Sequence, residues 1–194
     1  TEPTGSLVGY TNAGKSTLMN ALTDAGVLSE NKLFSTLDTR TRQWRMHDGR
    51  NILLSDTVGF IRDLPHGLVD AFAATLQEAV DADLLLHVVD ASNPAHPEQI
   101  ASVMGVLKDI GADHIPQVLV FNKLDAMDPA TIPSALVDLM ELDGQSVPRI
   151  YVSARSGQGL AELRGMLAER VLTQAVDMHP DVQGSLDGIE NTLP

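Results

Sequence analysis

Residues 9–16 of the chain read Gly9-Tyr10-Thr11-Asn12-Ala13-Gly14-Lys15-Ser16, which is the spacing G-x-x-x-x-G-K-S. Residues 6–8 before this stretch indicate a buried strand, and residues 17–22 after it indicate a helix. In a loop between a strand and a helix, successive backbone N–H groups point at bound phosphates, and the glycines let the backbone come close. The helix N-terminus adds a partial positive charge. The sequence therefore predicts a polyphosphate site, in which Lys15 reaches the β- and γ-phosphates and the Ser16 hydroxyl ligates Mg²⁺.

The composition is that of one globular domain. The 194 residues are 43% hydrophobic and 20% charged, which is ordinary for a soluble protein with a full core. No apolar run approaches the roughly 18 residues of a membrane span, and the first residues are not those of a signal peptide. The absence of cysteine excludes disulfides and thiolate metal sites. We expect a cytoplasmic monomer, and because residue 1 is Thr rather than Met, a fragment or a processed product.

Strand and helix patterns alternate along the chain. The predicted strands are 6–8, 41–46, 51–55, 84–89, 117–121 and 149–152, and the predicted helices are 17–22, 68–80, 97–110, 132–140 and 160–175. This alternation predicts a three-layer α/β domain with a six-stranded, mostly parallel sheet and one antiparallel edge strand, 41–46. The domain is expected over residues 1–175. Residues 176–194, which are acidic and lack Lys and Arg, are expected to form a flexible tail or linker.

A second motif, Asp56-Thr57-Val58-Gly59, follows the predicted strand 51–55. Ligands in such sheets bind at the carboxyl ends of the strands, so Asp56 would lie near the phosphate loop and hold Mg²⁺, most simply through water. The N–H of Gly59 would bond to the γ-phosphate. An aspartate after a strand commonly caps a turn, so the motif is weak alone. Because it lies about forty residues after the phosphate loop, the two motifs together strongly indicate one nucleotide site.

A third motif, Asn122-Lys123-Leu124-Asp125, selects the base. The carboxylate of Asp125 can accept two hydrogen bonds from guanine N1–H and the 2-amino group, whereas adenine has no matching pair of donors. Asn122 would brace the neighbouring loops, and the stem of Lys123 would pack along the base. After the last predicted strand, the tripeptide Ser153-Ala154-Arg155 would offer the N–H of Ala154 to guanine O6. Together these loops predict a site for GTP and GDP.

The same loops resemble those of the translation-factor branch of P-loop GTPases. Residues 8–17, 33–38 and 55–61 are closely similar to the HflX family, and the similarity runs from about Leu7 to Leu172. It implies a Ras-like fold and adds a switch loop, in which Thr36 closes onto Mg²⁺ and the γ-phosphate. The family often has Asp-Pro-Thr-Thr-Arg where this chain has Asp38-Thr39-Arg40-Thr41-Arg42. Loss of that proline would loosen the switch loop. It also makes Thr39 a weaker candidate than Thr36 for the threonine that closes onto Mg²⁺.

The motifs and the resemblance together give the expected ligand sets. The Mg²⁺ ligands are Ser16, Thr36 and Asp56. The residues expected to contact GTP are Gly9, Tyr10, Thr11, Asn12, Ala13, Gly14, Lys15, Ser16, Thr17, Phe34, Ser35, Thr36, Leu37, Asp38, Asp56, Thr57, Val58, Gly59, Asn122, Lys123, Leu124, Asp125, Ser153, Ala154 and Arg155.

Catalysis is expected to depend on Lys15, Thr36 and Gly59, without a side-chain general base. Many GTPases place a Gln after D-x-x-G to orient the attacking water, but this chain has Phe60, which can neither donate nor accept a hydrogen bond. We therefore expect slow intrinsic hydrolysis that awaits a partner. Asn12 resembles the asparagine that helps to bind K⁺ in cation-activated GTPases, which makes K⁺ an optional second cofactor in place of an arginine finger.

Two functions remain open from the sequence. The first is a GTP-hydrolysing switch that, by its resemblance to HflX, acts in ribosome splitting or rescue on the large ribosomal subunit, mainly through regions absent from this chain. The alternative is a nucleotide-dependent binding module with negligible hydrolysis, which Phe60 keeps open. The net charge of −13 argues against broad nucleic-acid binding. Five arginines between residues 40 and 62 form either an ordinary solvated edge or a patch for RNA phosphates.

Overall fold

The computed structural model describes residues 2–23, 40–46, 49–57 and 77–178. These residues form a seven-stranded sheet with the order β2-β3-β1-β4-β5-β7-β6. The strands are β1 Thr4–Gly9, β2 Arg40–Arg45, β3 Asn51–Asp56, β4 Leu84–Asp90, β5 Gln117–Asn122, β6 Val137–Leu142 and β7 Gln145–Tyr151. The five inner strands are parallel, and β2 and β6 at the two edges are antiparallel to their neighbours.

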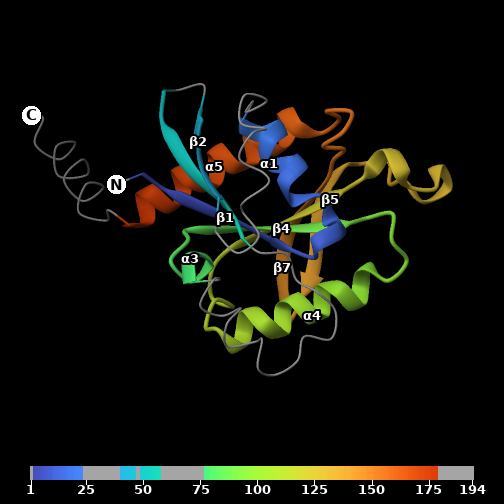
Figure 1. Ribbon diagram of the computed structural model, residues 1–194, viewed down its shortest axis with the longest axis horizontal. Coiled ribbons are helices and arrows are strands. Elements are labelled where there is room, and N and C mark those ends of the chain that lie inside the picture. The colour runs from blue at the N-terminus through green and yellow to red at the C-terminus, as the bar shows by residue number, and fades with distance from the viewer. Residues whose placement is uncertain (1, 24–39, 47–48, 58–76, 179–194) are drawn as a thin grey trace, which may run out of the picture.

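Helices cover both faces of the sheet. Helices α1 Lys15–Thr23 and α5 Leu160–Met178 lie on one face, and α3 Gln77–Val80 and α4 His96–Asp109 lie on the other (Figure 1). The predicted three-layer α/β fold is therefore confirmed. α5 ends beyond the domain boundary expected at residue 175. Within the described ranges, no helix is both long and apolar enough to cross a membrane.

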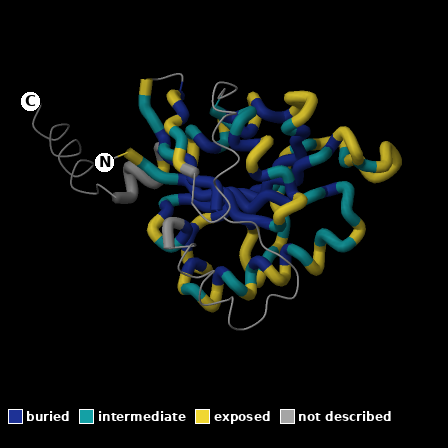
Figure 2. Tube along the Cα trace, in the orientation of Figure 1, coloured by how far each residue is buried: buried dark blue, intermediate teal, exposed yellow. Residues whose placement is uncertain are grey.

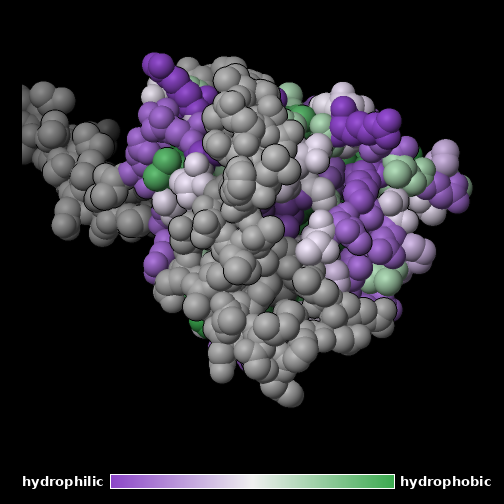
Figure 3. Space-filling model, in the orientation of Figure 1, coloured by the Kyte–Doolittle hydropathy of each residue, from purple (hydrophilic) through white to green (hydrophobic). Residues whose placement is uncertain are grey.

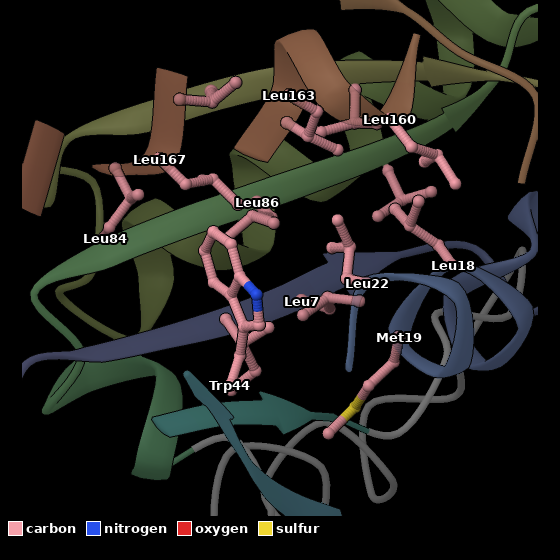
Figure 4. Close-up of a cluster of buried hydrophobic side chains, with 14 of the residues drawn as sticks. Leu7, Leu18, Met19, Leu22, Trp44, Leu84, Leu86, Leu160, Leu163 and Leu167 are labelled. Atoms are coloured by element: carbon pink, nitrogen blue, oxygen red, sulfur yellow. The ribbon is translucent and has the colours of Figure 1, made fainter. Parts of the chain in front are cut away.

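The sheet is buried on both faces, as expected for parallel strands between two helical layers. In Figure 2 its central strands form a continuous buried band, while the helices expose their outer sides. On the face of α1 and α5, Leu7 and Leu86 pack with helix residues such as Leu18 and Leu163 (Figure 4). Trp44 of the edge strand β2 is only 8% exposed and packs into this cluster, so it is a core residue rather than a stacking surface for bases.

The predicted helix at 132–140 is wrong. Residues Val137–Leu142 form β6, which pairs with β7 through a two-residue turn, so the sheet has one strand more than expected. The turn residues Asp143 and Gly144 both have positive φ, 51° and 79°, which an Asp-Gly pair adopts readily. An Asp-Gly pair between apolar runs is a strong hairpin signal, and it outweighs the helix-like spacing of the residues before it. Of the helix predicted at 68–80, only 77–80 falls within the described residues.

A buried polar pair lies under α4. The side chain of His87 on β4 is fully buried, and its Nδ1 lies 3.3 Å from Oε1 of Gln117. Burial lowers the pKa of His87 to about 4, although the hydrogen bond with Gln117 opposes this shift. The imidazole is therefore neutral in the folded protein at pH values where an unfolded histidine, with a pKa near 6.5, takes up a proton.

We predict that His87 makes the domain acid-sensitive. Below about pH 6.5 only the unfolded state binds this proton, so the free energy of unfolding falls until about pH 4, by about 3 kcal/mol in total. Urea denaturation between pH 7.5 and 4.5 measures this slope. The variant His87→Leu should show a shallower slope than the wild type, and the exposed His114→Gln should keep it. Equal slopes in His87→Leu and the wild type would contradict the assignment.

Candidate functional site

The phosphate loop joins β1 to α1 through the short 3₁₀ helix η1 Thr11–Ala13. Two glycines set its path, because an added Cβ would meet other parts of the backbone or a side chain. At Gly9 it would lie 2.3 Å from the carbonyl oxygen of Val88, and at Gly14 it would lie 2.6 Å from Nδ2 of Asn122. Gly14 also has a φ of +88°, which disfavours any other residue. The loop is thus held in close contact with both β4 and the end of β5.

Lys15, Ser16 and Asp56 form a cluster at the start of α1. The Ser16 hydroxyl donates to Oδ2 of Asp56 at 2.9 Å, and Nζ of Lys15 lies 3.9 Å from Oδ1. Burial lowers the pKa of Lys15 because it disfavours the charged ammonium, while the carboxylate of Asp56 opposes this effect. The two motifs that the sequence placed about forty residues apart therefore meet at one point of the fold.

This cluster fits Mg²⁺. Oδ1 of Asp56 is buried and accepts no hydrogen bond, although most buried carboxylate oxygens have a donor. A hydroxyl and a single carboxylate are the kind of oxygen ligands that Mg²⁺ takes while it keeps several waters. The other predicted Mg²⁺ ligand, Thr36, lies outside the described residues. So do the predicted contacts at 34–38 and 58–59, and Phe60.

Thr57 has a role in the fold that the motif did not indicate. Its hydroxyl donates to the carbonyl oxygen of Leu7 at 2.7 Å, and its N–H approaches the same oxygen at 3.3 Å. Thr57 thus fixes the end of β3 to β1, close to the phosphate loop. The spacing of residues in the motif could not predict this hydrogen bond, because Thr57 and Leu7 meet only through the pairing of β1 with β3.

Asn122 ties three loops together. Its Nδ2 donates to the carbonyl oxygen of Ala13 in the phosphate loop at 2.9 Å, and its Oδ1 accepts from the N–H of Ala154 at 3.0 Å. The side chain is 3% exposed. These contacts are the bracing that the sequence predicted. They also use the N–H of Ala154, which the sequence assigned to guanine O6, so this donor is already engaged in the structure.

Asp125 is held by Ser153 from the loop that follows β7. The Ser153 hydroxyl donates to Oδ1 of Asp125 at 2.9 Å, and its oxygen accepts from the N–H of Ser156 at 3.0 Å. Ser153 itself is fully buried. The carboxylate of Asp125 is exposed, so Ser153 fixes its orientation while leaving it open to a ligand.

Lys123 adopts a left-handed conformation, with φ of 67°. Its Nζ lies 3.2 Å from Oδ2 of Asp90, the residue that ends β4. Oδ1 of Asp90 accepts from the N–H of Ser92 at 3.0 Å and from the Ser92 hydroxyl at 2.6 Å. Asp90 therefore closes its own turn and also anchors the lysine. The Asp90–Lys123 ion pair links the end of β4 to the loop of residues 122–125, here called the base loop. The sequence did not indicate this contact.

Comparisons with known proteins agree with this geometry. A sequence model of the family described as "50S ribosome-binding GTPase" matches residues 4–123. The GTPase HflX of Lacrimispora saccharolytica is 47% identical over 174 residues, and that of Escherichia coli is 46% identical over 170 residues. These matches cover 90% and 87% of this chain but 39% and 38% of the relatives. The chain thus spans about two fifths of the length of these curated relatives.

Solved structures show the same fold. A GTP-binding protein from Sulfolobus solfataricus in complex with GDP matches with a TM-score of 0.68 and 28% identity, over 89% of this chain and 53% of that one. The FeoB G-domain from Methanococcus jannaschii matches with a TM-score of 0.61 over 88% of this chain and 97% of that one; at 23% identity it supports the fold alone.

The fold and the loops define a P-loop GTPase domain. Within that class, the chain belongs to the HflX family.

Proposed function

We propose that this domain binds GTP with Mg²⁺, hydrolyses it to GDP and phosphate, and uses the cycle as a conformational switch on the large ribosomal subunit. The observation that carries the proposal is the pairing of two clusters at the carboxyl ends of the strands. Lys15, Ser16 and Asp56 suit a metal-bound polyphosphate, and Asp125 with Ser153 suits a guanine base. Asn122 connects the two clusters through the phosphate loop.

At the phosphate end, the chain supplies charge and fixed N–H groups. Among the described residues, the buried ammonium of Lys15 faces the carboxylate of Asp56 at 3.9 Å, which is longer than a close ion pair, so a bound phosphate would give it a nearer counter-ion. Ser16, Asp56 and Thr36 would hold Mg²⁺, which neutralises charge on the β- and γ-phosphate oxygens when it is bound. Residues 9–14 would surround the phosphates with backbone N–H groups.

At the base end, Asp125 would accept the N1–H and 2-amino hydrogens of guanine. Ser153 reduces the entropy lost on binding because it already orients the carboxylate. The aliphatic stem of Lys123, whose ammonium is held by Asp90, would lie along the base. For guanine O6, the N–H of Ala154 would have to leave or share its bond to Asn122, and the next N–H in the chain, that of Arg155, is the second donor we propose.

Hydrolysis would be slow without a partner. We propose Thr36 and the N–H of Gly59 as groups that respond to the γ-phosphate, and Lys15 as the group that stabilises its charge. Phe60 cannot position the attacking water. The alternative function, a binding module with negligible hydrolysis, is less well supported because the curated relatives are GTPases by name. We place the protein in the cytoplasm and treat the residues after α5, 179–194, as a linker, with the ribosome contacts shared with regions outside this chain.

Multiple-turnover GTP hydrolysis tests this proposal. The assay contains Mg²⁺, with and without purified bacterial large ribosomal subunits, in KCl or NaCl at equal ionic strength. We expect slow turnover by the domain alone and an increase of about tenfold or more with the subunits, since a partner can order Thr36 or supply the group that positions the attacking water. Asp56→Asn should abolish turnover in every condition. Tight GTP binding without turnover in any condition would favour the binding module instead.

The two salts test K⁺ separately. If Asn12 helps to hold K⁺ beside the phosphates, turnover is faster in KCl than in NaCl, and Asn12→Ala removes the difference. Equal rates in the two salts would remove K⁺ from the mechanism without affecting the assignment of GTP and Mg²⁺.

A further inference from the structure

The edge strand β6 has an open side. It pairs with β7 and with no other described strand. Its two-residue turn fixes the hydrogen-bonding pattern, so that alternate residues, beginning with Leu142 opposite Gln145, exchange backbone hydrogen bonds with β7. The bond from the Tyr151 N–H to the Leu136 carbonyl, 2.9 Å, fits the same alternation. The N–H and C=O groups of Val137, Leu139 and Glu141 therefore point away from the sheet.

The same strand presents apolar side chains to solvent. Leu139 is 66% exposed and Val137 46%, and Ile132 nearby is 39% exposed. Over the ranges that the structure describes, these three are the exposed large hydrophobic residues. A free edge with apolar side chains is a site where a further strand can add, and proteins usually block such an edge with Lys, Pro or a bulge. Within Val137–Leu142, β6 has no Lys, Pro or bulge, and its two charged side chains are the acidic Asp138 and Glu141.

Side-chain contacts of Arg149 link β6 to β7 and to the core beside it. The guanidinium of Arg149 donates to both oxygens of Asp138, at 2.8 and 2.6 Å, and lies 5.0 Å from the ring centre of Phe121. It also lies 5.3 Å from the ring centre of Tyr151. This anchoring fixes the edge before any partner arrives, so little conformational entropy is lost on strand addition.

The charge around β6 selects the partner. Residues 124–148 contain five acidic residues and no Lys or Arg. Asp138 is paired with Arg149. Glu141, which accepts from the Ser146 hydroxyl at 2.7 Å, and Asp143 are exposed. In Figure 3, hydrophilic side chains with smaller hydrophobic groups among them cover the side that carries the yellow segment of Figure 1. Because the charged residues of 124–148 are all acidic, this surface repels RNA phosphates and attracts a basic polypeptide. It also disfavours a second copy of this chain, whose net charge is −13.

We infer that β6 accepts an extended segment of a basic protein of the large ribosomal subunit as an added strand. The backbone of that segment pairs with Val137, Leu139 and Glu141, its alternate apolar side chains cover Val137 and Leu139, and its Lys or Arg residues face Glu141 and Asp143. This inference rests on the proposed function, which supplies the large subunit as the partner.

Cysteine labelling tests the inference, because the chain contains no cysteine of its own. Leu139→Cys is compared with Ala101→Cys, an exposed position on α4. With purified large subunits and a non-hydrolysable GTP analogue, maleimide labelling of position 139 should slow about tenfold or more, while position 101 keeps its rate. A benzophenone attached at position 139 should crosslink to ribosomal protein, giving a product sensitive to protease and resistant to ribonuclease.

Several outcomes would overturn the inference. If the domain co-sediments with the subunits and the rate of maleimide labelling at position 139 is unchanged, the inference is wrong and the proposed function stands. A crosslink to rRNA would also reject a protein segment as the occupant. Absence of co-sedimentation would reject a subunit contact made by this domain, and with it the inference, whereas GTP hydrolysis is measured independently of that contact.

A charge reversal gives a second measurement. Asp143→Lys should weaken co-sedimentation about tenfold, because it removes an attractive charge and adds a repulsive one at the turn of the hairpin. Asp109→Lys makes the same change at the end of α4 and should have little effect. Equal effects of the two variants would mean that only net charge matters, which would contradict a specific site at β6.

Discussion

Asp125→Asn is expected to exchange the base preference of the domain from guanine to xanthine nucleotides. The carboxylate would accept two hydrogens from guanine, whereas the amide would place an NH₂ group against the 2-amino group. Xanthine carries an oxygen at that position and accepts from the amide. Because a buried polar group without a partner is strongly rejected, affinity for GTP should fall about a hundredfold or more, and xanthosine triphosphate should bind better than GTP.

Competition titrations with a fluorescent guanine nucleotide measure this exchange. Asp128→Asn is the matched control, because Asp128 is also exposed and its side chain accepts from the N–H of Ala130 at 3.1 Å, a bond that Asn can make as well. It should leave the base preference unchanged. If Asp125→Asn retains the GTP selectivity of the wild type, the base assignment is wrong, and Ser153 would then hold Asp125 for a structural reason only.

Gly14→Ala is expected to abolish tight nucleotide binding. The new Cβ would lie 2.6 Å from Nδ2 of Asn122, and the backbone there has a φ of +88°. The residue must either strain its backbone, at a cost of roughly 1–2 kcal/mol, or displace Asn122 from the carbonyl oxygen of Ala13. Either change moves the phosphate loop relative to the base loop, so GTP affinity should fall about a hundredfold or more.

Gly105→Ala provides the comparison. Gly105 lies inside α4, and an added Cβ there meets nothing within 4 Å. Alanine favours the helix, so the free energy of unfolding should rise by about 0.5–1 kcal/mol with GTP binding unchanged. Nucleotide titrations and urea denaturation of both variants separate the effects. If Gly14→Ala binds GTP as tightly as Gly105→Ala, the close contact between the phosphate loop and Asn122 does not contribute to GTP binding.

The parts of the site that depend on local pattern could be predicted from the sequence. The spacing of residues 9–16 indicated the loop between β1 and α1, and the place of Asn122 after a buried strand indicated its bracing contacts. Such signals succeed because the strand ends converge at one edge of a parallel sheet. The anchoring of β6 by Arg149, the bond from Thr57 to Leu7 and the ion pair of Lys123 with Asp90 join distant segments, so no spacing in the chain indicates them.

The missed hairpin shows a different limit. Residues 132–140 have a mixed apolar and acidic pattern that fits a helical face, and intrinsic preferences separate helix from strand only weakly there. The decisive information lies just beyond, in Asp143 and Gly144, whose positive φ angles suit a tight turn. Pairing with β7 then determines the strand.

The two antiparallel edges of the sheet also have a consequence for the order in which the chain folds. The pair Leu142 and Gln145 is close in sequence, whereas the parallel pair Thr4 and Leu53 must close a long loop. Hairpins form in about 1–10 μs, and pairing between distant strands is slower because more chain entropy is lost first. We expect the hairpins β2–β3 and β6–β7 to form early and the register of β1 between β3 and β4 to limit the folding rate. The phosphate loop, which begins where β1 ends, would then be assembled last.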